Sequence, residues 1–327
     1  MHRMTASERP IPQSRRFPFG IPNGWFLVAY AEDVAPGQVV RRHYLDRELV
    51  LFRGESGALA VLDAHCPHLG AHLGHGGRVV GDSLRCPFHA WRFDVQGRCV
   101  EIPYAERIPP RARAGVYPCV ERNGMVFCWY DARGRAPAFE VPDIAEWHDP
   151  GYLTPWFRYE WTLRTQPQEM AENGIDWPHF ASIHRMTVPD TRHAEFREHS
   201  YLWSVGGSKS VSTLEGARDD LVMRGENWGL GYSFLRQTGR FETVVATGLT
   251  PIDEATTHVQ MGVIGKQAGL SRDALSETLR RYVEEHAVLA EEDFPIWENK
   301  RFRADPLLCD GDGPIAEYRR WAAQFYR

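Results

Sequence analysis

Two short Cys–His pairs constrain the fold of this chain more than any other feature of its sequence. Residues 65–89 read HCPHLGAHLGHGGRVVGDSLRCPFH and contain five of the 14 histidines and two of the six cysteines. Cys66 is followed two residues later by His68, and Cys86 is followed three residues later by His89, with 17 residues between the pairs. Each pair places one thiolate and one imidazole on a tight loop. The segment therefore predicts a metal site built from two loops.

The mixed pairing indicates which metal the site binds. Zinc fingers pair cysteine with cysteine and histidine with histidine, whereas each loop here supplies one of each. This suits a [2Fe–2S] cluster in which two cysteines bind one iron and two histidines the other, the Rieske arrangement. We predict such a cluster at these four residues, with a zinc site as the alternative. His65, His72 and His75 fall outside the pattern and are interpreted as loop or surface histidines.

Composition limits the classes of partner. The chain has 327 residues with 38 Lys+Arg and 43 Asp+Glu, a net charge of −5, which argues against nucleic acid or an anionic membrane as the main partner. No apolar run approaches the roughly 18 residues of a membrane span. The N-terminus lacks the apolar core of a secretory signal. We therefore expect a cytoplasmic protein whose cysteines are reduced thiols.

The pattern of apolar runs and turn signals divides the chain. Residues 1–20 are polar and predict a flexible arm. Short apolar runs between turns predict a small all-β domain, to which we assign residues 21–135 as the Rieske domain. Residues 131–143 are rich in Pro, Gly and charge and are typical of a domain crossing. The second domain is assigned to residues 136–327.

One hairpin of the first domain can be predicted in register. Asn123-Gly124 is a preferred two-residue turn, and centring the hairpin on it places Cys119 opposite Cys128. These two residues could form a redox pair. We interpret them instead as small buried hydrophobes, because a reducing compartment keeps thiols unpaired.

The second domain is expected to combine strands with a long helix. Strand-like runs occupy residues 198–266, and residues 271–302 have a helical pattern. Apolar positions of this helix recur at steps of three, four and seven: Leu275, Leu279, Tyr282, His286, Leu289 and Ile296. Aromatic residues of the strands could line a substrate pocket or form ordinary sheet core: Trp203, Tyr232, Phe234 and Phe241. No substrate-binding residue is predicted.

A second metal site is suggested by ENGIDWPHFASIH at residues 172–184. His179 and His184 lie about 140° apart on an ideal α-helix, so they converge only if the helix is distorted, for example by a π-bulge. Two histidines and one carboxylate form the iron site typical of non-haem Fe(II) oxygenases. Asp293 is our candidate for the carboxylate, because it falls on the apolar stripe of the long helix. Glu291 falls on the opposite face.

An unpaired buried carboxylate such as Asp293 is costly, so it should be paired or bind a metal. Pro295 should also bend the helix at this point, because proline removes a helical hydrogen bond. The second domain is therefore predicted to hold a mononuclear iron.

These motifs resemble the α-subunits of Rieske non-haem iron oxygenases, from about Trp25 to the C-terminus. CPHLGAHLGHG…RCPFHAW resembles the family's Rieske motif, and N-x-x-D-x-x-H-x-x-x-x-H at 173–184 resembles its iron motif. The ending EEDFPIWENKRF…PLLCDGDGPIAEYRRWAAQFYR is similar to that of the 3-ketosteroid 9α-hydroxylase oxygenases and cholesterol 7-desaturases. Leu69 stands where many relatives carry Arg, and Ala90 where many carry Gly.

The resemblance implies an α+β fold, in which an all-β Rieske domain precedes a helix-grip (START-like) domain. There an antiparallel sheet wraps around a long C-terminal helix. It also implies a head-to-tail homotrimer, in which Asp176 bridges His179 and the partner subunit's His89. Electrons would come from NAD(P)H through a separate flavin and iron–sulfur ferredoxin reductase, with or without a ferredoxin.

The expected activity is that of a monooxygenase. Dioxygen and reductase electrons would hydroxylate a C–H bond of a bulky hydrophobic, sterol-like substrate. The same metals could instead perform desaturation or N- or O-demethylation of a smaller or aromatic substrate. A Rieske electron carrier without oxygenase activity is the alternative from another class.

Overall fold

The computed structural model describes residues 16–186, 191–210, 218–238, 241–266 and 269–327. Residues 1–15 of the predicted arm lie outside the described residues. Arg16, the first described residue, is buried, and its guanidinium donates to the carbonyl oxygens of Arg164, Trp297 and Lys300. This end of the chain is therefore anchored to the C-terminal part of the molecule.

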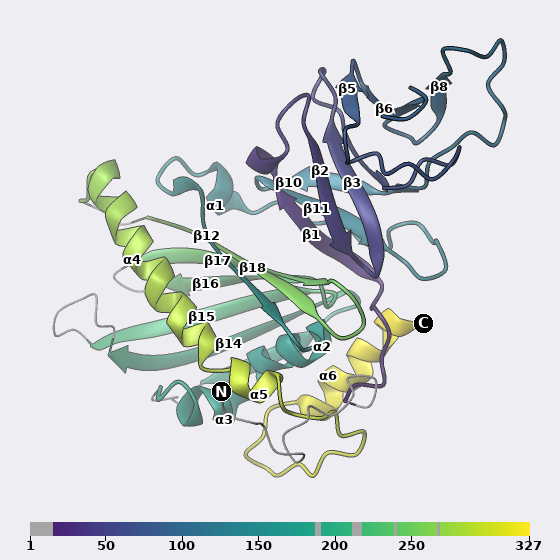
Figure 1. Ribbon diagram of the computed structural model, residues 1–327. Coiled ribbons are helices and arrows are strands. Elements are labelled where there is room, and N and C mark those ends of the chain that lie inside the picture. Colours follow the sequence, from purple (N-terminus) through teal and green to yellow (C-terminus); the bar gives the residue numbers. More distant parts are fainter. Residues whose placement is uncertain (1–15, 187–190, 211–217, 239–240, 267–268) are drawn as a thin grey trace, which may run out of the picture.

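The N-terminal part is all-β, as predicted (Figure 1). Its strands form three small antiparallel sheets, in the orders β1-β11-β10, β2-β3-β4-β9 and β5-β6-β7-β8. The strands are β1 (Gly24–Tyr30), β2 (Val39–Tyr44), β3 (Arg47–Arg53), β4 (Leu59–Asp63), β5 (Arg78–Val80), β6 (Ser83–Arg85), β7 (Arg92–Asp94), β8 (Cys99–Glu101), β9 (Val116–Tyr117), β10 (Cys119–Arg122) and β11 (Met125–Tyr130). A 3-10 helix at Ala31–Asp33 follows β1.

The predicted hairpin register is confirmed. β10 and β11 pair with Cys119 opposite Cys128, and the turn residues Asn123 and Gly124 have φ values of 55° and 70°. Such positive φ values suit the tight turn for which this pair is preferred. Both thiols are free, and burial raises the pKa of Cys119 to about 11 and that of Cys128 well above its usual value. They behave as small packed side chains rather than reactive thiols.

The C-terminal part is built on one seven-stranded antiparallel sheet, in the order β12-β18-β17-β16-β15-β14-β13. Its strands are β12 (Leu153–Leu163), β13 (Arg192–Phe196), β14 (Ser200–Ser210), β15 (Arg218–Trp228), β16 (Tyr232–Thr238), β17 (Glu242–Pro251) and β18 (Thr257–Lys266). With the long helix α4 beside it, this sheet confirms the predicted α+β fold (Figure 1). β13 lies outside the range 198–266 in which the sequence predicted strands.

The helices are short except for α4. They are α1 (Ala145–His148), α2 (Pro167–Ala171), α3 (Trp177–Ser182), α4 (Arg272–Glu291), α5 (Phe294–Trp297) and α6 (Ile315–Ala322), with 3-10 turns at Glu172–Ile175 and Ala323–Tyr326. α4 begins after Ser271, whose hydroxyl accepts from the Ala274 N–H as an N-cap. Among the described helices, none has both the length and the apolar character needed to cross a bilayer.

The apolar stripe of the long helix is only partly as predicted. The residues of α4 that are buried against the sheet are spaced by four: Leu275, Leu279, Val283 and Ala287. The prediction for Ile296 was wrong, because its side chain is 45% exposed. The cause is that α4 ends at Glu291 and α5 is a separate turn, so the phase of the stripe does not continue.

The sheet joins the two parts of the molecule through its outer face. Tyr232 and Phe234 of β16 pack there against Trp25, Phe127 and Trp129 of β1 and β11. Because side chains alternate along a strand, the intervening residues of β16 point to the opposite, inner face. The inner face carries the site described below.

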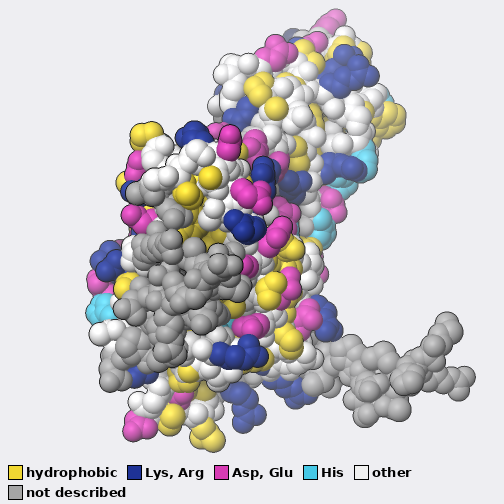
Figure 2. All heavy atoms as spheres, turned by 90° about the vertical axis from the view of Figure 1, so that its left-hand side faces the viewer, with side chains coloured by type: hydrophobic (Ala, Val, Ile, Leu, Met, Phe, Trp, Pro, Cys, Tyr) yellow, Lys and Arg dark blue, Asp and Glu magenta, His cyan; other side chains and the backbone are white. Residues whose placement is uncertain are grey.

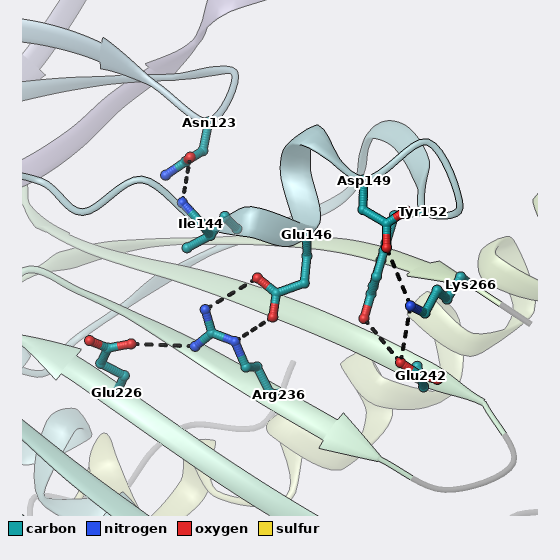
Figure 3. A network of polar contacts seen from close by, with 9 residues as sticks. All are labelled: Asn123, Ile144, Glu146, Asp149, Tyr152, Glu226, Arg236, Glu242 and Lys266. Atoms are coloured by element: carbon teal, nitrogen blue, oxygen red, sulfur yellow. Dashed lines mark hydrogen bonds and ion pairs between the residues drawn. The ribbon is translucent and has the colours of Figure 1, made fainter.

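Polar contacts fix the connecting segment onto the same outer face (Figure 3). Glu146 of α1 accepts from Arg236 of β16 at 2.6 Å, and Arg236 also reaches Glu226 of β15 at 3.3 Å. Lys266 of β18 lies 3.3 Å from the Asp149 carboxylate. The crossing between the two parts is therefore held by charge pairs as well as by aromatic packing.

Candidate functional site

The first candidate site lies on the two loops that carry the Cys–His pairs. One loop follows β4, and the other joins β6 to β7. The rings of His68 and His89 are 4.8 Å apart between centroids at 71°, and the thiols of Cys66 and Cys86 are within hydrogen-bonding reach. The structure thus brings the predicted ligands together as one pair of sulfurs and one pair of imidazoles. This arrangement fits a cluster with two differently ligated irons.

The two ends of this site differ in exposure. Cys66 and Cys86 are each 3% exposed, and burial is the first cause that raises the pKa of the Cys66 thiol to about 11. A thiolate there needs a compensating cation, which a bound metal would supply. His68 stacks on Trp91 at 4.5 Å, and His89 is half-buried. The imidazole end therefore lies toward the surface.

The surface around that end is apolar. Leu69, Phe88 and Tyr104 are 66%, 61% and 62% exposed, and Tyr104 OH accepts from Trp91 Nε1 at 2.8 Å. These three exposed apolar side chains lie around the two loop histidines. Exposed apolar patches of this kind often mark a contact with another protein.

The three other histidines of this segment have partners elsewhere. The His72 ring lies 3.7 Å from the Glu48 carboxylate, and His75 contacts Arg41 at 2.7 Å. His65 is exposed, and its ring packs against His72 with centroids 5.1 Å apart.

The second candidate site is built where helical structure is interrupted. The segment predicted as a distorted helix is divided into α2, a 3-10 turn and α3, with His179 inside α3 and His184 beyond its end. A π-bulge was suggested by the sequence, but the structure instead ends the helix at Ser182 and places Arg185 at a left-handed φ of 53°. The chain reversal beyond α3 brings the two rings together, with centroids 5.2 Å apart.

Asp293 completes the site from the other end of the domain. One donor atom from each of His179, His184 and Asp293 lies within 4.8 Å of the other two. Asp293 is 6% exposed and lies at the break between α4 and α5, whereas Glu291 points outward and accepts from Trp161 Nε1. Two imidazoles and one carboxylate form a donor set that suits Fe(II) with open positions.

Hydrogen bonds orient the two rings so that each Nε2 faces the site. His179 Nδ1 donates to the main-chain carbonyl of Asp176, and His184 Nδ1 donates to the Glu292 carboxylate at 2.9 Å. Burial, the largest cause, lowers the pKa of His179, so this ring is held neutral as a metal ligand must be. Each ring is thus fixed through the nitrogen that would not bind metal.

Two residues of this site were not identified from the sequence. Glu292 also contacts Arg185 at 3.1 Å, and Asn173 donates from Nδ2 to Asp293 at 2.9 Å. Glu292 directly precedes the predicted ligand, but its role depends on where α4 ends. Asn173 was part of the quoted iron motif and had no assigned role.

Asp176 contacts His179 through its carbonyl rather than through its carboxylate. The Asp176 carboxylate is half-buried, and burial is the main cause that raises its pKa. Among the described residues, no side chain or main-chain N–H donates a hydrogen bond to this carboxylate. Figure 1 shows α3 and the β5–β8 sheet at opposite ends of the molecule. Contact between Asp176 and the Rieske loops therefore cannot occur within one chain.

A cavity of about 460 Å³ lies between α4 and the inner face of the sheet, and the three clustered residues are among those that line it. Most of its walls are apolar, with Met170, Leu249 and Met261 among them. Trp203 and Phe241 line this cavity, whereas Tyr232 and Phe234 belong to the outer face. The four aromatic residues considered from sequence thus divide by their side of the sheet.

Two glycines make room for one of the tryptophans that line the cavity, Trp203. Trp203 Nε1 donates to Asn227 Oδ1 at 3.0 Å, and a Cβ at Gly225 would lie 2.0 Å from Trp203 Cε2. A Cβ at Gly174 would lie 2.5 Å from the same indole. The indole therefore lies flat between two positions that only glycine can fill.

Comparison with known proteins follows the same division of the chain. Residues 24–117 match the Rieske [2Fe-2S] domain family, and residues 128–326 match the 3-ketosteroid 9alpha-hydroxylase C-terminal domain family. The chain is 32% identical to cholesterol 7-desaturase of Caenorhabditis elegans, with 93% of this chain and 77% of the relative covered. It is also 32% identical to a 3-ketosteroid-9-alpha-monooxygenase oxygenase component of Rhodococcus rhodochrous, with coverages of 96% and 83%.

Solved structures share the fold at lower identity. Dicamba monooxygenase bound to dicamba superposes with a TM-score of 0.76 at 21% identity, covering 94% of this chain and 98% of that one. NdmA of Pseudomonas putida CBB5 with caffeine gives a TM-score of 0.74 at 20% identity, with coverages of 91% and 89%. At this identity the likeness concerns the fold.

Proposed function

This chain belongs to the Rieske non-haem iron oxygenases, in the branch with the 3-ketosteroid 9α-hydroxylase C-terminal domain, and we propose that it oxidises a bulky, steroid-like substrate. The resemblance predicted from its motifs is confirmed. The substrate class is inferred from the cavity of about 460 Å³, which is lined mostly by apolar side chains and also by His179, His184 and Asp293. A hydrophobic molecule in that cavity would present one carbon to these residues.

We propose Cys66, His68, Cys86 and His89 as the cluster ligands. His179, His184 and Asp293 are proposed as the ligands of the mononuclear iron. When bound, the cluster relays single electrons and the iron activates dioxygen. Support comes from the buried thiols, the paired imidazoles and the donor set of the second site.

The chain's own residues prepare this chemistry. The Asp176 carbonyl and the Glu292 carboxylate each keep a proton on Nδ1 of one histidine, so the Nε2 lone pairs face the site, where the Asn173 amide nitrogen lies 3.3 Å from His179 Nε2. Asn173 holds one oxygen of Asp293 through its amide. The apolar walls exclude water from the place where a substrate carbon would lie, which limits side reactions.

We further propose a head-to-tail homotrimer in which the Asp176 carboxylate meets the partner subunit's His89. The proposal is supported by the placement of α3 and the β5–β8 sheet at opposite ends of the molecule in Figure 1 and by the exposed apolar residues around His89. A separate reductase supplies electrons, as the name of an oxygenase component implies. We retain residues 21–135 and 136–327 as the two domains, and a cytoplasmic location in keeping with the free thiols.

Desaturation is the second candidate outcome, because the chain is 32% identical both to a cholesterol 7-desaturase and to a ketosteroid monooxygenase. The two outcomes differ only in whether the substrate gains an oxygen atom or loses two hydrogens. Mass spectrometry of the product separates them directly.

The test combines metal analysis with turnover. We expect three irons per chain, two in the cluster and one mononuclear. An electron carrier would bind two, and a zinc-stapled protein none. With a surrogate reductase and NAD(P)H, steroids should be oxidised in preference to small aromatic compounds. Oxidation of the small aromatics alone would refute the substrate class while leaving the family membership intact.

A further inference from the structure

Both ends of the molecule expose apolar side chains that the fold of one chain leaves uncovered. The segment between α5 and α6 carries Leu307 and Leu308, which are 101% and 43% exposed. At the other end are the three exposed side chains around the Rieske loops. Figure 2 shows hydrophobic side chains at the upper and the lower end of the molecule, where these two regions lie in Figure 1. Such exposure is typical of surfaces that a partner covers.

The two leucines belong to a loop, residues 305–312, that lies beside Asp176. A Cβ at Gly313 would lie 1.6 Å from the carbonyl oxygen of Ile175, so the end of this loop touches the start of α3. Burial is the largest cause that raises the pKa of Asp176, and the negative charge of Asp312 is one of the others. The Asp312 carboxylate also accepts from the Cys309 N–H at 2.8 Å, which closes the turn directly after the leucines. The exposed leucines are therefore next to the face that carries Asp176.

This loop is acidic, and we call it the acidic loop. Within its eight residues it contains three aspartates and no lysine or arginine. Lys300 and Arg319, on either side of it in the sequence, pair with Glu169 and Glu172 instead. Even when the two exposed arginines at positions 301 and 303 are counted with it, the loop and Asp176 together have more carboxylates than guanidinium groups. The face around Asp176 is therefore negatively charged.

The Rieske end has the opposite charge. Four exposed arginines lie on β5, β6 and the loop after β8, and among the described residues none of them forms an ion pair: Arg78, Arg85, Arg107 and Arg111. Asp94 and Glu101 pair with neighbouring arginines of the same sheet, whereas Asp82 and Glu106 offset two of the four charges. We call these four arginines and the three exposed apolar side chains the Rieske face. It combines a net positive charge with apolar groups, as the acidic loop combines a negative charge with apolar groups.

We propose that the acidic loop docks on the Rieske face of a second copy of this chain, with Leu307 and Leu308 packed against the apolar side chains around His89 of the partner subunit. This inference rests on the proposed homotrimer and adds the segment that holds it together. A second copy fits because one chain carries both complementary faces at opposite ends, so that copies can associate head to tail (Figure 1). Opposite charges on the two faces steer the encounter and fix its register.

The first test measures the assembly of the iron-loaded holoenzyme by light scattering over a range of concentrations. The double variant Leu307→Arg/Leu308→Arg changes two side chains that one chain already exposes, so its fold should be that of the wild type. We expect its trimer to dissociate at a concentration at least about 10-fold higher than that of the wild type, because apolar anchors at the centre of an interface contribute factors of this size. A double variant that assembles as the wild type does would overturn the proposal.

Val288→Arg is the matched control. Val288 is 61% exposed on α4, away from both faces, so this variant introduces the same charge at another exposed apolar position. It should assemble as the wild type does. If it dissociates as readily as the double leucine variant, the effect is one of net charge and the docking of the acidic loop is wrong.

The second test removes charge and keeps the leucines. Asp305→Asn/Asp310→Asn should weaken assembly and make it less sensitive to added NaCl, because screening then has fewer opposite charges to act on. Arg107→Gln/Arg111→Gln, on the Rieske face, should have the same two effects. A salt dependence that neither pair of substitutions changes would refute the pairing of the two faces.

The outcomes separate this inference from the proposed function. If the wild type is monomeric, the homotrimer fails and the docking of the loop with it, whereas iron content and product analysis still decide whether the chain is an oxygenase. If the wild type is a trimer and the leucine variant assembles equally well, only the role of the loop fails. If the leucine variant stays trimeric but the reductase reduces its cluster more slowly, the loop contacts the reductase, and the proposal is overturned.

Discussion

Replacing Glu292 tests whether the hydrogen bond behind His184 holds the iron site together. Glu292 accepts from His184 Nδ1 at 2.9 Å and is 26% exposed in its side chain. A hydrogen bond to a charged group contributes roughly 1.5–3 kcal/mol, and partial exposure places this one near the lower end. About 1.5 kcal/mol corresponds to roughly a 10-fold change in affinity. Glu292→Ala should therefore bind Fe(II) about 10-fold more weakly than the wild type.

Glu292→Gln should have a smaller effect. It keeps an acceptor oxygen near His184 but loses the charge, and a charge-assisted bond is roughly twice as strong as a neutral one. We expect about a 3-fold loss of affinity. The measurement is competition with a chromophoric Fe(II) chelator, with the visible absorption of the cluster recorded in the same sample. That absorption should not change, because the cluster ligands lie in the other part of the chain.

Glu291→Gln provides the matched control. It makes the same chemical change one residue earlier, where the carboxylate accepts from Trp161 Nε1 and not from a histidine of the site. This variant should bind Fe(II) as the wild type does. If Glu292→Ala binds iron with unchanged affinity, or if Glu291→Gln is weakened as much, the positioning role of Glu292 is wrong.

Three further perturbations follow from the structure. Asp176→Asn should retain all three irons but lose substrate oxidation, with the reduced cluster persisting in stopped-flow absorbance; full turnover would contradict the bridging role. Gly225→Ala should lower stability by about 1–3 kcal/mol in denaturant titration, because its Cβ would lie 2.0 Å from the Trp203 indole; unchanged stability would show that the indole can move. Burial is the largest cause that raises the pKa of Glu169 above its usual 4.5, although Lys300 lies 2.8 Å away. The folded state then holds the proton more tightly, so the unfolding free energy of the wild type relative to Glu169→Gln should fall as pH rises above 4.5; a pH-independent difference would be inconsistent with this.

The features that depend on short stretches of sequence could be predicted best. The hairpin through Asn123 depends on a two-residue turn and a period of two, so its register could be predicted. The Cys–His pairs depend on spacings of two and three residues, and the loops bring them together. Asp293 was selected because it fell on an apolar stripe, and it is buried beside the two histidines although the helix breaks there.

What could not be predicted depended on where elements end and which side of the sheet they face. Glu292 and Asp293 are adjacent, and only the break after α4 turns one toward His184 and the other into the site. Trp203 and Tyr232 have similar aromatic character, but the strand register puts one in the cavity and the other at the domain contact. The position of Gln237 in the cavity wall could not be predicted, because a glutamine near a strand end is usually solvated.

The side chains of β16 alternate between the two faces of the sheet, and this affects which substitutions the enzyme can accept. Ser233, Leu235 and Gln237 line the cavity, whereas the residues between them pack against the Rieske part or pair with α1. Substitutions at the three cavity positions can alter the choice of substrate while the contacts that align the two parts persist. One strand thus separates the side chains that contact the substrate from those that align the two parts, and a combinatorial library at these three positions would explore new substrates without disturbing that alignment.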